Sequence, residues 1–185
     1  IANNKNNSLD QETLKEISFA VKSLNKVEKI KCIGLTGNSK FFSPGADIKE
    51  LKNLNSKQAK KNKLFSFVDQ LDKINIPIIS FVDGYALGGG FELALSTDII
   101  IASVDAKFGL PEVNLGLIPG IGGTQKLKKF TSNQNIKYLA MSGDIISSET
   151  AMKYGFVSLI VTKENFKTFT NEFLNRISSK PKKSL

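Results

Sequence analysis

The chain has 185 residues, a formal net charge of +9, and 41% apolar and 23% charged residues, a composition typical of one soluble globular domain. Its single cysteine, Cys32, and its lack of histidine exclude an internal disulfide, a multi-cysteine metal site, a serine triad and a Cys/His dyad. General acid–base chemistry therefore falls to Asp, Glu, Lys or Tyr. No apolar run reaches membrane-spanning length and no signal-peptide pattern opens the chain, so we expect a cytoplasmic protein.

The first half of the chain is predicted to alternate helices and strands. Ser8 with Gln11 reads as a capping box, which predicts a helix whose apolar residues follow at helical spacing. A buried strand is predicted over residues 31–37, a loop over 40–51 with a helical segment from Asp47, and a second amphipathic helix over 54–74.

The second half continues the alternation, which predicts an α/β fold with largely parallel strands in one domain, residues 1–185. Strands are predicted over residues 78–84, 98–103 and 156–161, and helical segments over 91–96, 124–130, 133–143, 147–155 and 164–177. Residues 107–123 carry so many Gly and Pro residues that we expect no regular structure there.

Two stretches place free backbone N–H groups at predicted helix starts. In SPGAD, residues 43–47, the N–H of Ala46 could point at a ligand oxygen, although an ordinary loop-to-helix junction has the same spacing. The triplet Gly88–Gly90 precedes another helix and lets a ligand approach the backbone, although close helix–strand packing also requires glycine. The triplet is not a P-loop, and Leu93 stands where a GxGxxG motif needs its last glycine.

Two glutamates accompany these stretches. Glu92 follows the glycine triplet, and Glu112 lies in an irregular segment among apolar residues, where desolvation would raise its pKa. Taken alone, however, a glutamate in a loop is usually a solvated surface residue. Together, two N–H donors and two carboxyl groups could polarise a carbonyl and supply an acid and a base without histidine.

The segments FFSPGADIKEL, GYALGGGFELAL and FGLPEVNLGLIPGIGGTQKL, in this order, resemble the enoyl-CoA hydratase/isomerase (crotonase) superfamily over nearly the whole chain. The resemblance implies a spiral of ββα turns and a thioester oxyanion hole made by the N–H groups of Ala46 and Gly89. Glu92 and Glu112, separated by 20 positions (112 − 92), match the glutamate pair of hydratases. The backbone of Gly120 matches a position that helps to place the catalytic water or carboxylate.

The resemblance therefore implies a lyase, a 2-enoyl-CoA hydratase of fatty-acid beta-oxidation that reversibly adds water across the C2=C3 bond of trans-2-enoyl-CoA thioesters. No cofactor and no metal are expected, because coenzyme A is part of the substrate. Its phosphates account for part of the positive charge, and family position places Ala46, Asp47, Ile48 and Lys49 on the coenzyme A path.

The chain also departs from the family pattern. Full-length members continue into C-terminal helices that cover the acyl pocket, and these and most of an N-terminal strand are expected to be absent here. The chain is therefore either a free-standing enzyme, expected to form a trimer or hexamer, or the hydratase domain of a bifunctional enzyme fused to a dehydrogenase.

Two alternative functions remain from the sequence. The first is a Δ3,Δ2-enoyl-CoA isomerase of the same fold, which needs only one well-placed glutamate. The second is RNA binding through lysines on or just after the first helix. Only Lys22 and Lys26 share a helical face there, and no aromatic residues are interleaved for stacking, which argues against it.

Overall fold

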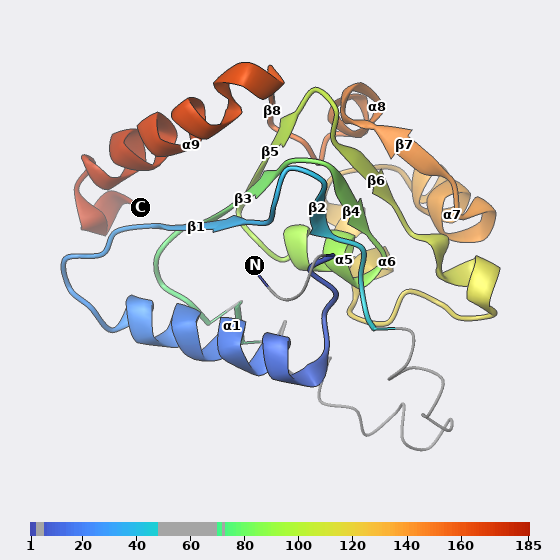
Figure 1. Cartoon of the computed structure of the whole chain (residues 1–185), viewed down its shortest axis with the longest axis horizontal. Helices are drawn as coiled ribbons and strands as arrows, with labels where there is room; N and C mark the ends of the chain where they lie inside the picture. Colours follow the sequence, from blue (N-terminus) through green and yellow to red (C-terminus); the bar gives the residue numbers. More distant parts are fainter. Residues whose placement is uncertain (3–5, 48–69, 72) are drawn as a thin grey trace.

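The computed structural model describes residues 1–2, 6–47, 70–71 and 73–185 (Figure 1). Most of the amphipathic helix predicted over residues 54–74 lies outside these ranges, as does most of the helical segment predicted to begin at Asp47. Within the described residues, no helix is long and apolar enough to cross a bilayer.

Two four-stranded sheets form the centre of the molecule. The first has the order β1 (Ile33–Thr36), β3 (Ile78–Val82), β5 (Ile99–Ser103), β8 (Leu159–Val161). The second has the order β2 (Phe41–Ser43), β4 (Tyr85–Leu87), β6 (Lys107–Gly109), β7 (Ile145–Ser147). Every neighbouring pair is parallel except β6 and β7, which confirms the predicted α/β fold with largely parallel pairing.

From β1 to β6, successive strands alternate between the two sheets. β1 leads into β2, β3 into β4 and β5 into β6, so each pair adds one strand to each sheet and the chain advances as a spiral. Because strands within a sheet are parallel, the ends of β2, β4 and β6 gather at one edge of the second sheet. The glycine triplet, the SPGAD stretch and the segment that carries Glu112 all follow directly from these ends.

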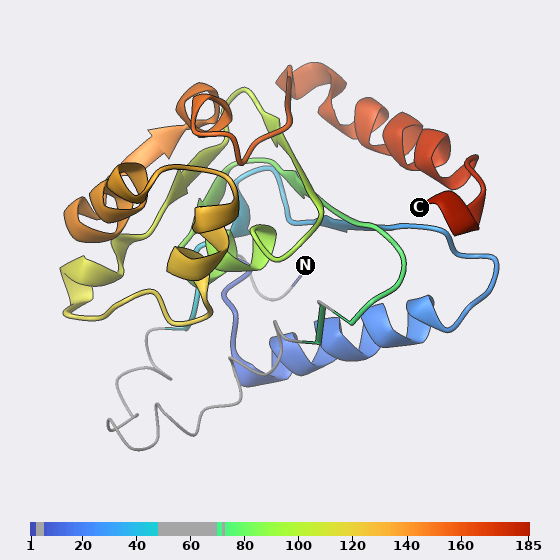
Figure 2. The same ribbon diagram turned by 180° about the vertical axis from the view of Figure 1, so that it is seen from behind.

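Helices lie around the sheets. They are α1 (Gln11–Asn25), α5 (Gly89–Ala94), α6 (Gly123–Lys126), α7 (Asn133–Ser142), α8 (Ser148–Lys153) and α9 (Lys163–Ser178), with 3₁₀ turns η1 (Pro111–Leu115), η2 (Leu127–Lys129) and η3 (Lys182–Ser184). In Figures 1 and 2, β1 runs between α1 and α9, whereas α7 and α8 lie at the far end of the molecule beside β7.

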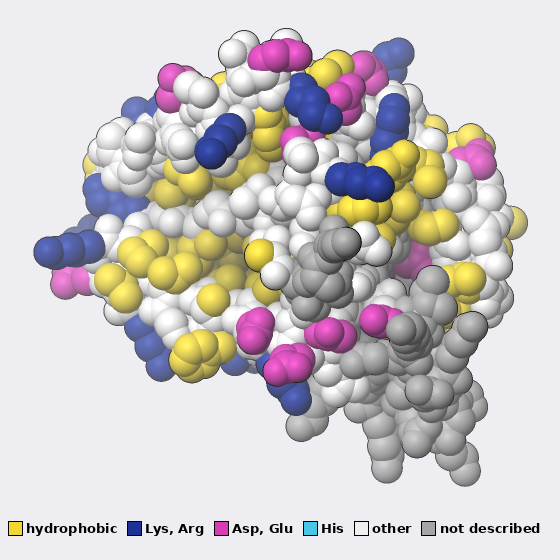
Figure 3. All heavy atoms as spheres, in the orientation of Figure 1, with side chains coloured by type: hydrophobic (Ala, Val, Ile, Leu, Met, Phe, Trp, Pro, Cys, Tyr) yellow, Lys and Arg dark blue, Asp and Glu magenta, His cyan; other side chains and the backbone are white. Residues whose placement is uncertain are grey.

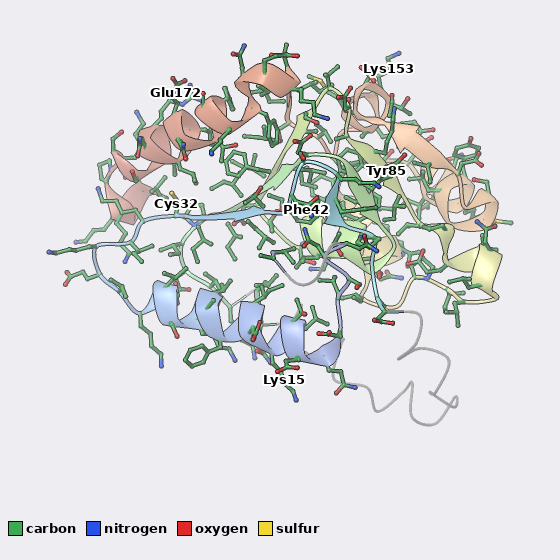
Figure 4. The ribbon with its side chains drawn as sticks, in the orientation of Figure 1. Lys15, Cys32, Phe42, Tyr85, Lys153 and Glu172 are labelled. Atoms are coloured by element: carbon green, nitrogen blue, oxygen red, sulfur yellow. The ribbon has the colours of Figure 1, made fainter. Side chains whose placement is uncertain are left out.

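The main core lies between the sheets and around α5. Phe91 of α5 contacts Phe108 of β6 and Phe156, with ring centroids 5.5 and 5.0 Å away, and all three side chains are buried. A second cluster joins Phe81 and Ile101 of the first sheet to the apolar face of α9. Phe42 of β2 lies in the middle of the molecule, and Lys15 and Lys153 lie at its periphery (Figure 4).

The surface is apolar in places and basic in others. Figure 3 shows exposed apolar side chains in the band between α1 and α9. On the same face, the Lys and Arg side chains are dispersed over several elements instead of forming one patch, so this view offers no basic surface of the kind that nucleic acids need.

Three local predictions were wrong. Asp10 caps α1, since its side chain accepts the N–H of Thr13, and the helix begins at Gln11 instead of following a cap at Ser8. The segment 107–123 contains β6 and η1, although its Gly and Pro residues predicted no regular structure. β2 likewise lies in a predicted loop. These three-residue strands are too short to show a hydrophobic period, and pairing with neighbouring strands defines them.

Candidate active site

The three consecutive glycines are required by close backbone approaches at the end of β4. Gly88 has a φ of +49° and donates its N–H to the carbonyl of Gly109, 2.9 Å away. A Cβ on Gly90 would lie 2.2 Å from the carbonyl oxygen of Ser43. α5 begins at Gly89, whose N–H has no partner within the helix. The triplet therefore combines close packing with a free donor, the two interpretations that the sequence left open.

The second predicted donor, Ala46, lies beside this helix start. Gly45 has a φ of +100°, and a Cβ there would lie 3.1 Å from the nitrogen of Gly89. A Cβ on Gly89 would lie 3.6 Å from the nitrogen of Ala46. The backbones that carry the two N–H groups are thus in contact, and glycine is needed on both sides of that contact.

The N–H groups of Ala46 and Gly89 each share a peptide group with the carbonyl of the preceding residue, and that carbonyl's hydrogen bond fixes the direction of the N–H. The Gly45 carbonyl accepts the N–H of Leu9 at 2.8 Å, and the Gly88 carbonyl accepts the N–H of Glu92 at 2.9 Å. In a trans peptide the N–H points opposite to the carbonyl, so the N–H groups of Ala46 and Gly89 point away from these partners. Neither has an acceptor among the described residues. Two free donors side by side are what an oxyanion hole requires.

Glu92 lies one turn into α5 and only 1% of its surface is exposed. Its Oε1 accepts the N–H groups of Ile121 at 2.8 Å and Gly123 at 2.7 Å. Burial raises the pKa of Glu92, and backbone hydrogen bonds from Gly123, Ile121 and Gly120 act in the opposite direction. The loop 120–123 therefore holds this carboxyl group in one orientation.

Glu112 lies in the first turn of η1, with its carboxyl group against the glycine triplet. Its Oε1 is 3.0 Å from the place that a Cβ on Gly88 would take. Its Oε2 is buried and has no hydrogen-bond partner among the described residues. Burial, with a smaller contribution from the charge of Glu92, raises the pKa of Glu112 to about 7. Glu112 is thus not the solvated surface residue that the sequence allowed.

The structure brings together most of the residues that the sequence singled out. Ala46, Gly89, Glu92 and Glu112 lie at the glycine triplet, and the backbone of Gly120 is close enough to Glu92 to lower its pKa. Asp47 follows Ala46 and donates its N–H to the carbonyl of Leu9 at 3.3 Å. Ile48 and Lys49, expected on the coenzyme A path, lie outside the described residues.

Three further residues of the site were not singled out from the sequence. Ile121 and Gly123 donate to Glu92, and the N–H of Leu9 orients the Ala46 peptide. The Gly and Pro residues of IPGIGG predicted an irregular segment, but nothing in it indicated which carboxyl group its N–H groups would bind. Leu9 acts through its backbone, which leaves no sequence signal.

Comparison with known proteins gives consistent results. The family model described as enoyl-CoA hydratase/isomerase matches residues 1–185. The chain is 40% identical over 173 residues to a probable mitochondrial enoyl-CoA hydratase of Dictyostelium discoideum, covering 94% of this chain and 62% of that protein. It is 37% identical over 179 residues to a short-chain-enoyl-CoA hydratase of Clostridium acetobutylicum, covering 94% of this chain and 67% of that protein.

A solved enoyl-CoA hydratase from Thermoplasma volcanium superposes with a TM-score of 0.88 at 34% identity, covering 96% of this chain and 71% of that one. This likeness confirms the expected crotonase-like fold. The chain thus spans about two thirds of the length of the relatives that it matches.

Proposed function

The chain belongs to the enoyl-CoA hydratase/isomerase family, and on that premise we propose that it is a 2-enoyl-CoA hydratase. It would add water across the C2=C3 double bond of enoyl-CoA thioesters to give 3-hydroxyacyl-CoA. The observation that carries the proposal is the placement of two carboxyl groups, Glu92 and Glu112, beside two free backbone N–H groups. Relatives at 37–40% identity bear hydratase names.

In the proposed reaction, Ala46 and Gly89 donate their N–H groups to the thioester oxygen. They draw electron density from the double bond, which makes C3 electrophilic, and they stabilise the negative charge that develops on that oxygen as the C3–O bond forms. Both donors are oriented before substrate arrives, so little reorganisation is needed at the moment of reaction.

The two glutamates supply the water and the proton. Ionised Glu92, whose carboxyl group is oriented by the N–H groups of Ile121 and Gly123, holds the water at C3 and takes its proton. Glu112 in its protonated form gives its proton to C2. A pKa of about 7 leaves about half of the Glu112 side chains protonated at neutral pH, and the buried Oε2 without a partner leaves an oxygen free for the substrate.

Coenzyme A would enter as part of the substrate, so the proposal needs no separate cofactor. The net charge of +9 suits its phosphates. The homo-oligomer, the alternative of fusion to a dehydrogenase and the cytoplasmic location expected from the sequence remain predictions. The names of two relatives place those proteins in mitochondria.

The test is an assay of crotonyl-CoA and a 3-enoyl-CoA side by side, with the complete gene product. Hydration removes the ultraviolet absorbance of the conjugated thioester, whereas isomerisation of the 3-enoyl substrate creates it. We expect rapid loss of absorbance with crotonyl-CoA. Turnover of the 3-enoyl-CoA alone would replace the hydratase assignment with the isomerase. Activity on neither substrate, with a steep salt-dependent shift of RNA, would favour RNA binding.

A further inference from the structure

Ser43, the last residue of β2, touches both halves of the donor pair. Its side chain is fully buried, and its Oγ accepts the N–H of Gly45 at 3.2 Å. Its carbonyl oxygen and Cβ lie 2.2 and 2.7 Å from the place that a Cβ on Gly90 would take. Gly45 immediately precedes Ala46, and Gly90 immediately follows Gly89. Ser43 thus contacts one chain neighbour of each residue that carries a free N–H group.

The Gly45 turn needs this contact because Pro44 restrains only the residue before Gly45 and leaves Gly45 itself free to rotate. Gly45 has no side chain and a φ of +100°, so many other backbone conformations are open to it. The pairing of β2 with β4 is already irregular, with a register shift between Phe41 and Ser43. Two hydrogen bonds therefore hold the turn, one from Gly45 N–H to Ser43 Oγ and one from Leu9 N–H to the Gly45 carbonyl.

We propose that Ser43 is a positioning residue for the oxyanion hole. Its hydroxyl holds the Gly45 N–H so that the next N–H in the chain, that of Ala46, stays aligned with that of Gly89. This inference rests on the proposed function, because it takes the thioester oxygen as the acceptor. Loss of the hydroxyl leaves the buried Gly45 N–H without an acceptor, and the turn then rotates to find one.

The effect is expected on the transition state more than on binding. Among the described residues, the Ser43 hydroxyl bonds the N–H of Gly45, so its loss acts on the donor turn. Misalignment of one donor weakens an interaction that is strongest when the oxygen carries negative charge. A Ser43→Ala variant should therefore lower kcat about 3- to 10-fold, the range that one hydrogen bond supports, with little change in KM.

A chromophoric ligand reports the donors directly. A coenzyme A thioester of 4-dimethylaminocinnamic acid absorbs at longer wavelength as its carbonyl is polarised, so its red shift on binding measures the strength of the hole. We expect a smaller red shift with Ser43→Ala than with the wild type. A second variant, Ser43→Cys, fills nearly the same volume with a weak acceptor, so it separates the hydrogen bond from packing and should also reduce the shift.

Ser80→Ala is the matched control, because Ser80 is a fully buried strand serine whose Oγ accepts a hydrogen bond from Thr97 at 3.0 Å. It should lose stability but keep kcat and the red shift. Wild-type kcat and red shift in Ser43→Cys would overturn the inference, whether or not Ser43→Ala folds. If the wild type itself neither hydrates crotonyl-CoA nor shifts the probe, the proposed function fails as well, which distinguishes the two failures.

Discussion

Replacement of Glu112 by Gln tests the centre of the proposed chemistry. Gln has nearly the same size and can still form hydrogen bonds, but it cannot give a proton to carbon. Glu112 is positioned by η1 against Gly88, and its Oε2 has no partner within the described residues, so the substitution breaks no protein contact at that oxygen. Any loss of activity can therefore be assigned to the missing proton.

The expected loss in kcat is about 10²- to 10⁴-fold, the range for removal of a general acid. The pH profile gives a second measure. Because the pKa of Glu112 is raised to about 7, the proton-donating form is lost as pH rises through 7, and kcat/KM should fall about tenfold per pH unit above it. The residual activity of Glu112→Gln should lack this alkaline limb.

The same pKa predicts that Glu112→Gln, which lowers activity, raises the stability of the fold at alkaline pH. The folded pKa lies above the ordinary value of 4.5, so the folded protein binds this proton more tightly and the free energy of unfolding falls as pH rises from about 4.5 to 7. A carboxyl group held at a pKa of about 7 costs at most about 3 kcal/mol when ionised, and partial exposure reduces this to roughly 1–2 kcal/mol. Glu112→Gln should therefore gain stability at pH 8 and gain little at pH 4.5.

The measurements are crotonyl-CoA hydration by ultraviolet absorbance from pH 6 to 9, and urea unfolding at pH 4.5 and 8. Glu164→Gln provides the control, since it makes the same change at an exposed position in the first turn of α9. It should leave both measurements unchanged. Hydration by Glu112→Gln at the wild-type rate would refute the assignment of the proton donor. Equal urea midpoints at pH 8 would refute the argument from burial.

Three further substitutions test the surroundings of these groups. Glu92→Gln should lower kcat about 10²- to 10⁴-fold in the hydration assay with an unchanged circular dichroism spectrum, and near-wild-type turnover would remove Glu92 from the mechanism. Gly123→Ala places a Cβ 2.7 Å from Cγ and 2.9 Å from Oε1 of Glu92, so the carboxyl group must move and kcat should fall about 10²-fold; unchanged kinetics would show that this orientation is unimportant. Gly90→Ala places a Cβ 2.2 Å from the carbonyl oxygen of Ser43 and should lower the free energy of unfolding by about 3 kcal/mol or more in urea, which a wild-type midpoint would contradict.

The longer elements could be predicted from the sequence because their periodicity is local. The apolar spacing in α1, α7 and α9 and the β-branched runs of β1, β3 and β5 are each read within one segment. The three-residue strands β2, β4 and β7 could not be predicted in this way. They are strands because other chain segments hydrogen-bond to them, and those partners lie 22 or more positions away in the sequence.

The site divides in the same way. The candidates Ala46, Gly89, Glu92 and Glu112 were found from short motifs and a family resemblance, because glycine and carboxylate requirements leave a mark on the sequence. The pKa values and orientations of the two glutamates left no such mark on the sequence. Whether Glu112 is solvated or desolvated depends on η1 folding against Gly88, and the orientation of Glu92 depends on Ile121 and Gly123, 29 and 31 positions further along.

The sequence by itself determined the fold class, the family and the chemical groups on offer, since composition excluded histidine chemistry and the glycines marked where backbone must be bare. Only the tertiary structure decided that the N–H groups of Ala46 and Gly89 lie side by side. It also decided that each points away from the hydrogen bond that the carbonyl of the same peptide accepts. A peptide's direction is set by the hydrogen bond at its other end, and those bonds come from Leu9 and from the first turn of α5. The linear sequence gave no indication of a role for the Ser43 hydroxyl, because its contacts form only where β2 packs against the glycine triplet.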